Sequence, residues 1–158
     1  TNAFSQCLSK DVVNEIIKAP SKLTLGGKNM EMSAIFTDIQ KFSGFSELLS
    51  ASELVQLLNY YLTRMSEIII NEHGTVDKYE GDAIVAFIGA PLNTPDHAKR
   101  AVRSALKMKS AEIGMNAEII EIAKGEKPEN MNQDLYDAFC IMVKNGKNLL
   151  GKKYCCFQ

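Results

Sequence analysis

Residues 75–91 read TVDKYEGDAIVAFIGAP, in which a mixed run and an apolar run flank an acidic turn. The runs 75–79 and 84–88 are rich in β-branched and aromatic residues, a composition that favours strands. The segment EGDA at 80–83 predicts a hairpin turn with Asp82 at its acidic tip. We therefore expect a pair of short antiparallel strands that presents a carboxylate at one end.

The residues before this hairpin predict a strand followed by a long helix. Residues 30–36 alternate and then become apolar, which predicts a strand that leads into Asp38. The segment FSGF at 42–45 predicts a tight connection that contains a glycine. Residues 52–71 place apolar side chains on one helical face, and His73-Gly74 ends this helix.

The residues after the hairpin predict helices alone. A helix starts near Thr94 and runs through Met108, with an end near Ala111. Residues 115–123 and 132–150 each predict a further helix. The order strand, helix, strand, strand, helix indicates an α+β fold in which helices cover one face of an antiparallel sheet.

Composition and charge exclude several classes of protein. The chain has 158 residues, of which 46% are hydrophobic and 23% charged, and these values rule out a disordered or collagen-like chain. The formal net charge of −1 gives no bulk attraction to nucleic acid or to an anionic membrane. The longest apolar stretch, 83–91, is far shorter than the roughly 20 apolar residues that span a bilayer. We expect neither nucleic-acid binding nor direct membrane insertion.

The cysteines and histidines carry weaker signals. None of the four cysteines lies in a C-x-x-C pair, which fits reduced thiols in a cytoplasmic protein. The terminal CCFQ at 155–158 fits a prenylation pattern, which also arises easily by chance. No signal peptide precedes Thr1, which we interpret as a cut inside a longer protein. His73 and His97 are interpreted as helix-end and helix-start residues, because no third metal ligand accompanies them.

Two acidic residues stand out by their positions. Asp38 follows an apolar strand, and Asp82 lies in a turn 44 residues later. If the two strands are neighbours, both carboxylates reach one edge of the sheet, which suits Mg²⁺. The loop 39–45 leads into a long helix, where backbone N–H groups favour phosphate. The alternative is structural, with Asp38 as a strand-end cap and Asp82 as a turn residue.

Two motifs resemble the metal motifs of the class III nucleotide cyclases. IFTDIQKFS at 35–43 resembles the first motif, and KYEGDAIVAFIGAP at 78–91 resembles the second. The lead-in segments 9–13 and 25–27 and the helix after the second motif resemble those of bacterial members. The chain is identified as a member of this family over about residues 8–110. The resemblance implies the ferredoxin-like α+β fold of the cyclase domains.

The resemblance also implies a two-metal site. Asp38 and Asp82 would be the catalytic carboxylates that hold two Mg²⁺ or Mn²⁺ ions, with the Ile39 carbonyl as a further ligand. In this family the ribose 3′-hydroxyl attacks the α-phosphorus, which yields a cyclic nucleotide and pyrophosphate. The substrate-binding residues would be those of the phosphate-cradling loop and of the second motif: Gln40, Lys41, Phe42, Ser43, Lys78 and Gly81.

Lys78 is the residue that favours ATP. Adenylyl cyclases carry Lys at the matching position, whereas guanylyl cyclases carry Glu. An ammonium group can donate to N1 of adenine, but it meets a donor on guanine. The alternative interpretation is a solvated lysine at a strand edge.

The second half of the family pattern is not recognisable. Family members continue into strands that carry an Asp for the adenine amino group, then an Asn and, four residues later, an Arg that stabilise the transition state. This chain contains no Arg after Arg103. Asn148 and Lys152 copy the spacing, but their surroundings differ, and we interpret them as part of a helical C-terminal end. We therefore expect a truncated or rearranged cyclase domain with three parts: a lead-in at 1–28, the first half of the catalytic domain at 29–111, and a divergent, mainly helical segment at 112–158.

The sequence thus predicts an adenylyl cyclase domain of intracellular signalling that is incomplete or inactive alone. In this family one protomer supplies the metals and the other the base-recognition and transition-state residues. A homodimer, or a cyclase-domain partner that supplies Asn and Arg, is therefore implied. The alternative is a non-catalytic cyclase-like module that binds nucleotide or mediates dimerisation. A diguanylate cyclase is disfavoured, because EGD at 80–82 is only distantly similar to the turn of that class.

Overall fold

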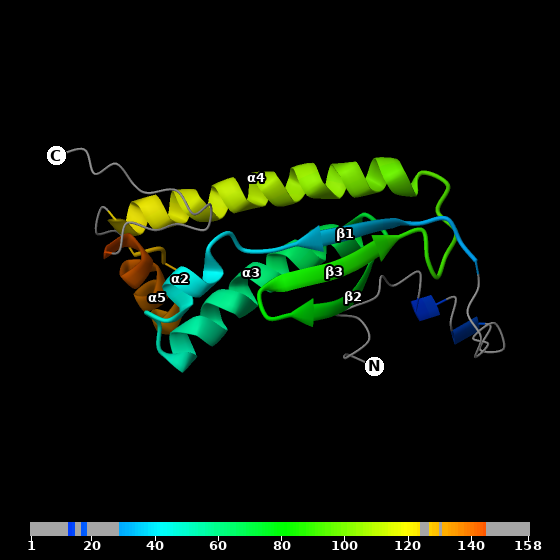
Figure 1. Cartoon of the computed structure of the whole chain (residues 1–158). Helices are drawn as coiled ribbons and strands as arrows, with labels where there is room; N and C mark the ends of the chain where they lie inside the picture. Colours follow the sequence, from blue (N-terminus) through cyan, green and yellow to red (C-terminus); the bar gives the residue numbers. More distant parts are fainter. Residues whose placement is uncertain (1–12, 15–16, 19–28, 124–126, 130, 145–158) are drawn as a thin grey trace. The chain divides into compact units, whose positions relative to one another are not determined.

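The chain is described by a computed structural model that covers residues 13–14, 17–18, 29–123, 127–129 and 131–144. Its elements in chain order are β1 (Ser33–Thr37), α2 (Phe42–Ser46), α3 (Ala51–Asn71), β2 (Thr75–Glu80), β3 (Ala83–Ile88), α4 (His97–Ala123) and α5 (Gln133–Lys144) (Figure 1). The chain divides into two compact units, Thr1–Thr37 with Arg64–Met108 and Asp38–Thr63 with Lys109–Gln158. Each unit is described by itself below.

The first unit holds a three-stranded sheet in the order β1-β3-β2 (Figure 1). Both strand pairs are antiparallel, and β1 pairs with β3 from Ser33 opposite Ile88 to Thr37 opposite Ile84. The register of β2 against β3 shifts between Val76 and Lys78. The predicted hairpin is therefore confirmed, and β1 and β3 are neighbours, which is the condition on which the placement of Asp38 and Asp82 at one edge depends.

The hairpin turn explains why glycine stands at position 81. Glu80 pairs with Ala83, so Gly81 and Asp82 form a two-residue loop. Gly81 has φ of 66°, whereas Asp82 is not among the residues with positive φ. This is the pattern of a type II′ turn, which requires glycine at its first central position. The turn therefore fixes where the Asp82 backbone leaves the sheet.

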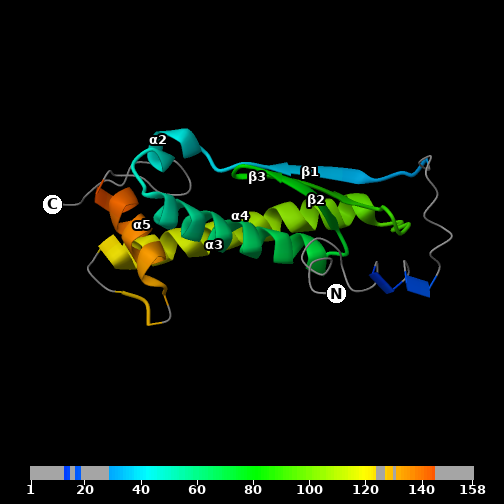
Figure 2. The same ribbon diagram turned by 90° about the horizontal axis from the view of Figure 1, so that it is seen from below.

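Helices cover one face of this sheet, as Figure 2 shows for the parts of α3 and α4 in the first unit. Ile35 in β1 is 8% exposed, while its neighbour Phe36 is 74% exposed on the opposite face. The buried apolar residues of this unit are Ile35, Met65, Ile69, Val76, Ile84, Ala86, Ile88 and Met108. The α+β architecture with a helix-covered antiparallel sheet is thus as predicted.

Helix α3 begins and ends with capping motifs. At its start, the Ser50 N–H donates to the Glu53 carboxylate at 2.7 Å and the Glu53 N–H donates to Ser50 Oγ at 3.3 Å, a capping box. At its end, His73 has φ of 62°, and the N–H groups of His73 and Gly74 donate to the carbonyls of Ile70 and Ile69. These two bonds form a Schellman motif. The predicted helix end at His73-Gly74 is confirmed.

The second unit packs helical segments around a small apolar core. Its buried apolar residues are Ile39, Leu57, Tyr61, Met115, Ile122, Leu135, Ala138 and Phe139. The rings of Tyr60 and Phe139 meet edge to face, with centroids 5.8 Å apart. Tyr60 also donates its hydroxyl proton to Glu118, and Ser52 donates to Asp134 at 2.6 Å. Aromatic packing and side-chain hydrogen bonds therefore hold α5 against α3.

Several helix predictions differ from the structure. The segment 42–46 forms the short helix α2 and not a simple connection. Helix α4 runs unbroken through Gly114, whereas two helices were predicted. Helix α5 reaches Lys144, and residues 145–150 of the predicted helix lie outside the described residues, as does most of the predicted lead-in helix. Among the described residues, no helix is both long and apolar enough to cross a bilayer.

The close packing at Gly74 gives a stability prediction. A Cβ at this position would lie 2.6 Å from Ile69 Cγ2 and 2.9 Å from the Ile69 carbonyl oxygen. Gly74→Ala should therefore lower the free energy of unfolding by about 1–3 kcal/mol, the usual cost of overpacking. Gly114→Ala is the matched control, because among the described residues nothing beyond its chain neighbours and the adjacent helix backbone lies within 4 Å of its Cβ position. In the interior of α4, alanine should instead stabilise by about 0.5–1 kcal/mol. Denaturant unfolding measures the free energy of unfolding of both variants. A change of the same sign and size in both would contradict the prediction.

Candidate functional site

The register of the sheet determines where the two acidic residues leave their strands. Thr37 is the last residue of β1 and lies opposite Ile84 of β3. Asp38 is the residue after Thr37, and Asp82 comes two residues before Ile84. The chain therefore reaches both residues at the same end of the β1–β3 pair. Asp38 is exposed and Asp82 is half-buried.

The loop after β1 is anchored by Ile39. The Ile39 side chain is buried, with 3% exposure, and its carbonyl accepts the Phe42 N–H at 3.2 Å. Lys41 lies inside this turn with φ of 60°, in the left-handed region that few side chains adopt. A carbonyl oxygen has two lone pairs, so Ile39 can accept this bond and still serve as a metal ligand.

The predicted phosphate-cradling segment Gln40–Ser43 lies partly in this turn and partly in α2. The side chains of Gln40, Lys41 and Ser43 are exposed, and Phe42 is half-buried. The Phe42 N–H is already bonded to Ile39, and the Lys41 carbonyl accepts the Gly44 N–H at 3.0 Å. The loop is thus held by its own backbone bonds, and phosphate recognition there would rest mainly on amides other than that of Phe42.

The second motif places an ion pair on an open part of β2. Lys78 Nζ lies 2.7 Å from a Glu80 carboxylate oxygen, with side-chain exposures of 55% and 58%. The hydrogen bond to Glu80, supported by its negative charge, raises the pKa of Lys78 above its usual value. Lys78 therefore stays protonated and remains a hydrogen-bond donor. The exposed Gly81 follows this pair in the turn.

Tyr79 lies between Lys78 and Glu80 in β2 and is hydrogen-bonded to helix α3. Its hydroxyl lies 2.9 Å from Ser66 Oγ, and Ser66 is 5% exposed in α3. Successive strand residues point to opposite faces. Lys78 and Glu80 therefore share the face opposite to Tyr79, away from the helices. That face also carries the exposed Phe36.

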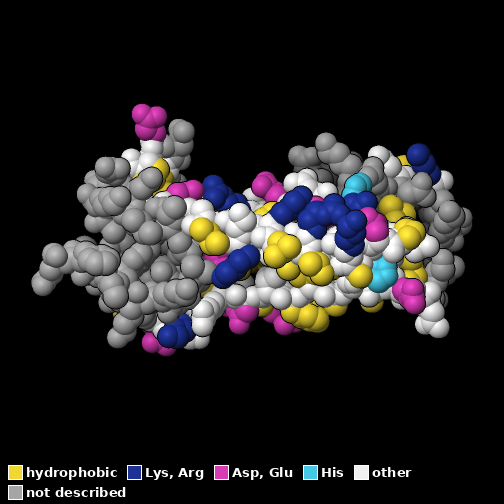
Figure 3. All heavy atoms as spheres, turned by 90° about the horizontal axis from the view of Figure 1, so that it is seen from above, with side chains coloured by type: hydrophobic (Ala, Val, Ile, Leu, Met, Phe, Trp, Pro, Cys, Tyr) yellow, Lys and Arg dark blue, Asp and Glu magenta, His cyan; other side chains and the backbone are white. Residues whose placement is uncertain are grey.

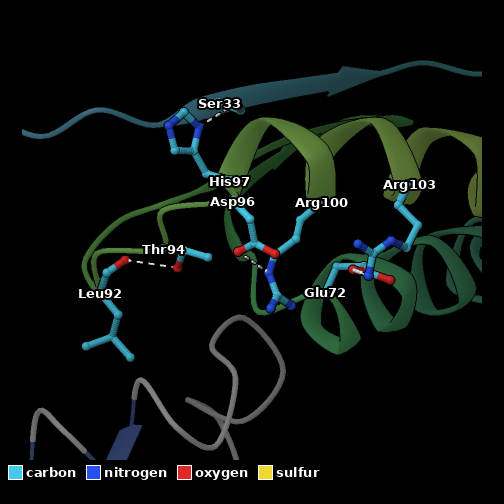
Figure 4. A network of polar contacts seen from close by, with 8 residues as sticks. All are labelled: Ser33, Glu72, Leu92, Thr94, Asp96, His97, Arg100 and Arg103. Atoms are coloured by element: carbon cyan, nitrogen blue, oxygen red, sulfur yellow. Dashed lines mark hydrogen bonds and ion pairs between the residues drawn. The ribbon is translucent and has the colours of Figure 1, made fainter.

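A buried carboxylate that sequence reasoning missed lies at the end of α3. Glu72 is 3% exposed and accepts hydrogen bonds from Arg103 at 3.2 Å and Lys107 at 2.5 Å. Figure 4 shows Arg103 reaching toward Glu72, and Figure 3 shows basic side chains gathered on one face of the molecule. The apolar face of α3 at Met65 and Ile69 continues to Glu72, a spacing that could have predicted its burial.

The two histidines occupy helix ends, as predicted. His73 follows the end of α3, and His97 is the first residue of α4. His97 Nδ1 lies 2.9 Å from Ser33 Oγ (Figure 4). Just before α4, Asp96 accepts a hydrogen bond from Arg100 at 2.8 Å, which lowers the pKa of Asp96. Within the described residues, no group of three or more His, Cys, Asp or Glu could hold a metal ion.

The donor set of the two motifs nevertheless has the chemistry that magnesium prefers. Asp38 and Asp82 offer carboxylate oxygens, and Ile39 offers a carbonyl oxygen. Mg²⁺ binds through one or two carboxylates and completes its shell with water and substrate phosphates. Each of these oxygens is therefore of the kind that Mg²⁺ takes as a ligand.

Comparison with known proteins defines the class. The model of the adenylate and guanylate cyclase catalytic domain matches residues 27–125. The chain therefore belongs to this family of nucleotide cyclase domains. Adenylate cyclase 1 of Rhizobium meliloti is 33% identical over 106 residues, which cover 65% of this chain and 16% of that protein.

Solved structures agree with this assignment. The adenylyl cyclase CyaB from P. aeruginosa is 32% identical with a TM-score of 0.56, covering 62% of this chain and 50% of that one. The guanylyl cyclase Cya2 is 29% identical with a TM-score of 0.53, covering 65% and 51%. The chain thus spans about half of the solved domains, and its relatives include cyclases named for each nucleotide.

Proposed function

We propose that this chain is the metal-binding half of an adenylyl cyclase site, which converts ATP to cyclic AMP and pyrophosphate in intracellular signalling. One observation supports this most: the strand register brings the chain positions next to Asp38 and Asp82 to one end of the β1–β3 pair. Both residues lie in the two segments that resemble the family's metal motifs, and both fall inside the matched range 27–125.

Each proposed residue has a physical task. The carboxylates of Asp38 and Asp82 and the Ile39 carbonyl would hold two Mg²⁺ or Mn²⁺ ions. Bound there, these ions would supply charge that acidifies the ribose 3′-hydroxyl and neutralises the triphosphate. The backbone of Gln40–Ser43 would hold the outer phosphates, and the turn at Gly81 sets the position of the Asp82 backbone.

The preference for ATP is part of the proposal and depends on Lys78, which in a dimer would meet the base of the nucleotide held by the partner's metal ligands. Its raised pKa keeps the ammonium charged, so that it can donate to N1 of adenine. The similar proteins include both an adenylate cyclase and a guanylyl cyclase, so the proposed preference for ATP depends on the residues of the site. The comparison is therefore made on this chain, by competition between ATP and GTP.

A second cyclase domain completes the proposed enzyme. The 158 residues contain no Arg after Arg103, and the described elements after Ile88 are the helices α4 and α5. A homodimer would bring a second set of metal ligands but no matching Arg, whereas a partner domain could supply both Asn and Arg. The same observation favours the second candidate, a non-catalytic module that binds nucleotide or mediates dimerisation.

A cytoplasmic location belongs to the same proposal. The described cysteine, Cys140, carries a free thiol, which suits a reducing compartment. ATP, the proposed substrate, is then available at the site.

The test is metal-dependent ATP binding by the whole chain. We expect calorimetry to show ATP binding with Mn²⁺ and little binding after chelation. Asp38→Ala and Asp82→Ala should each weaken binding by more than about 10–100-fold, the cost of losing mere outer-shell partners of a metal. Each substitution removes a carboxylate that the proposal assigns as a metal ligand.

Glu67→Ala is the matched control, because Glu67 is an exposed acid on α3 outside both motifs. It removes one negative charge and should leave ATP binding unchanged. Unaltered binding in both aspartate variants would reject the assigned site. An equal loss in the control would show that overall charge, and not the site, governs binding.

A further inference from the structure

The ion pair on β2 presents a donor and an acceptor side by side. Lys78 Nζ and the Glu80 carboxylate are 2.7 Å apart, and both side chains are more than half exposed. The partners of these residues on β3 are Val85 and Ala83, neither of which offers a charged group. The pair therefore has open space on one side and no competing ion on its neighbouring strand.

The Watson–Crick edge of adenine is complementary to such a pair. Its N1 accepts a hydrogen bond, and the adjacent 6-amino group donates one. An ammonium donates and a carboxylate accepts, and a Lys has three N–H groups to share between two partners. Lys78 can thus keep one bond to Glu80 while it donates another to the base.

We propose that Glu80 is a specificity-determining residue that accepts the adenine 6-amino proton while Lys78 donates to N1. This inference rests on the proposed function, because it concerns the base of the same nucleotide. Glu80 would take the task of the aspartate that cyclase domains carry further along the chain, in the half that is not recognisable here. The two groups come from one strand, so no second strand is needed to bring them together.

The same pair can meet guanine only in the reverse order. Guanine presents an acceptor at position 6 and a donor at N1, so Lys78 would have to serve the first and Glu80 the second. A comparison of ATP with GTP therefore tests two things at once: the orientation of the base, and whether the Lys78–Glu80 pair contacts it. Purine riboside triphosphate is a sharper probe, because it keeps N1 and the triphosphate and lacks only the 6-amino group.

The experiment measures ATP and purine riboside triphosphate binding with Mn²⁺ on the whole chain. The wild-type chain should prefer ATP by about 10-fold, the equivalent of one charge-assisted hydrogen bond at its weaker end. Glu80→Ala should abolish this preference. Because both nucleotides carry the same triphosphate, their ratio is independent of any effect of Glu80 on the nearby Asp82. Lys78→Met should weaken the binding of both nucleotides, and it should keep more of the preference for ATP than Glu80→Ala does.

Asp77→Ala is the matched control. Asp77 is an exposed acid on the same strand, and its charge also acts on Lys78. The control should keep the preference for ATP. A preference that survives Glu80→Ala, or is lost equally in Asp77→Ala, would overturn the role of Glu80 and leave the proposed function standing. Absence of any metal-dependent ATP binding would overturn both.

Discussion

A purified chain of these 158 residues should bind ATP with Mn²⁺ and form little or no cyclic AMP. The reason is the missing cation at the transition state. In phosphoryl transfer a positioned Arg is worth on the order of 10³ to 10⁵ in rate. This chain has no Arg after Arg103, and both Arg100 and Arg103 are engaged with acidic partners in the first unit.

Dimerisation of identical chains would not repair this loss. In the proposed pairing each site borrows its transition-state groups from the other copy, and neither copy has the matching Arg. Lys152 could contribute a charge, but an ammonium lacks the planar fork with which guanidinium binds phosphate oxygens. Lys152 lies outside the described residues.

The assay compares cyclic AMP formation by the chain alone and mixed with a cyclase domain that carries Asn and Arg but lacks its own metal aspartates. Mixing should raise the rate by about 10³-fold or more. An Asp82→Ala version of this chain in the same mixture is the control, and it should stay inactive. Robust turnover by the chain alone would be the contrary result, and it would mean either that Asn148 and Lys152 do the work or that the second half of the chain has been misinterpreted. No gain on mixing would favour the non-catalytic module.

The hairpin and its acidic turn were predictable because local chemistry alone determines them. Gly81 with φ of 66° occupies a position that few other residues tolerate, and runs rich in β-branched and aromatic residues flank the turn. The pairing of β1 with β3 followed from a neighbouring-strand assumption that the register confirms. The roles assigned to Asp38, Asp82 and Lys78 stay predictions, because they concern ions and a nucleotide.

The continuity of α4 could not be predicted from local preference. Gly114 has poor helix propensity, but its cost of about 1 kcal/mol is small beside the burial of large side chains. Met108, Met115 and Ile122 recur every seven residues and are 6%, 0% and 5% exposed. Burial along one helical face therefore decides the structure at this glycine. The same spacing rule, extended along α3, would have placed Glu72 inside.

Removal of both cations around Glu72 should strongly destabilise the first unit. The Glu72 side chain is 4% exposed and is held by Arg103 and Lys107, which are 43% and 53% exposed. A buried carboxylate without a partner typically costs about 3–5 kcal/mol. Because a whole domain is stable by only about 5–15 kcal/mol, the double variant Arg103→Met, Lys107→Met should lose a large part of its stability.

Lys99→Met, Lys109→Met is the matched control for this double variant. It also replaces two cationic side chains of the same helix by Met, at exposed positions. Lys109 pairs with Glu112 at the helix surface, an interaction worth little. Guanidinium chloride unfolding should show a loss below about 0.5 kcal/mol for the control. A similar loss in both double variants would mean that the Glu72 charge is not buried.

The substitution Glu72→Leu separates charge burial from lost packing. Combined with Arg103→Met and Lys107→Met, it removes the whole ionic cluster and fills the space with apolar groups. Replacement of a buried ion pair or triad in this way is often neutral or stabilising by about 1–4 kcal/mol. We therefore expect the triple variant to be more stable than the double variant with Glu72 intact. If the triple variant were less stable than the double one, the cluster would contribute through packing and hydrogen bonds, and the cost of an isolated charge would be minor.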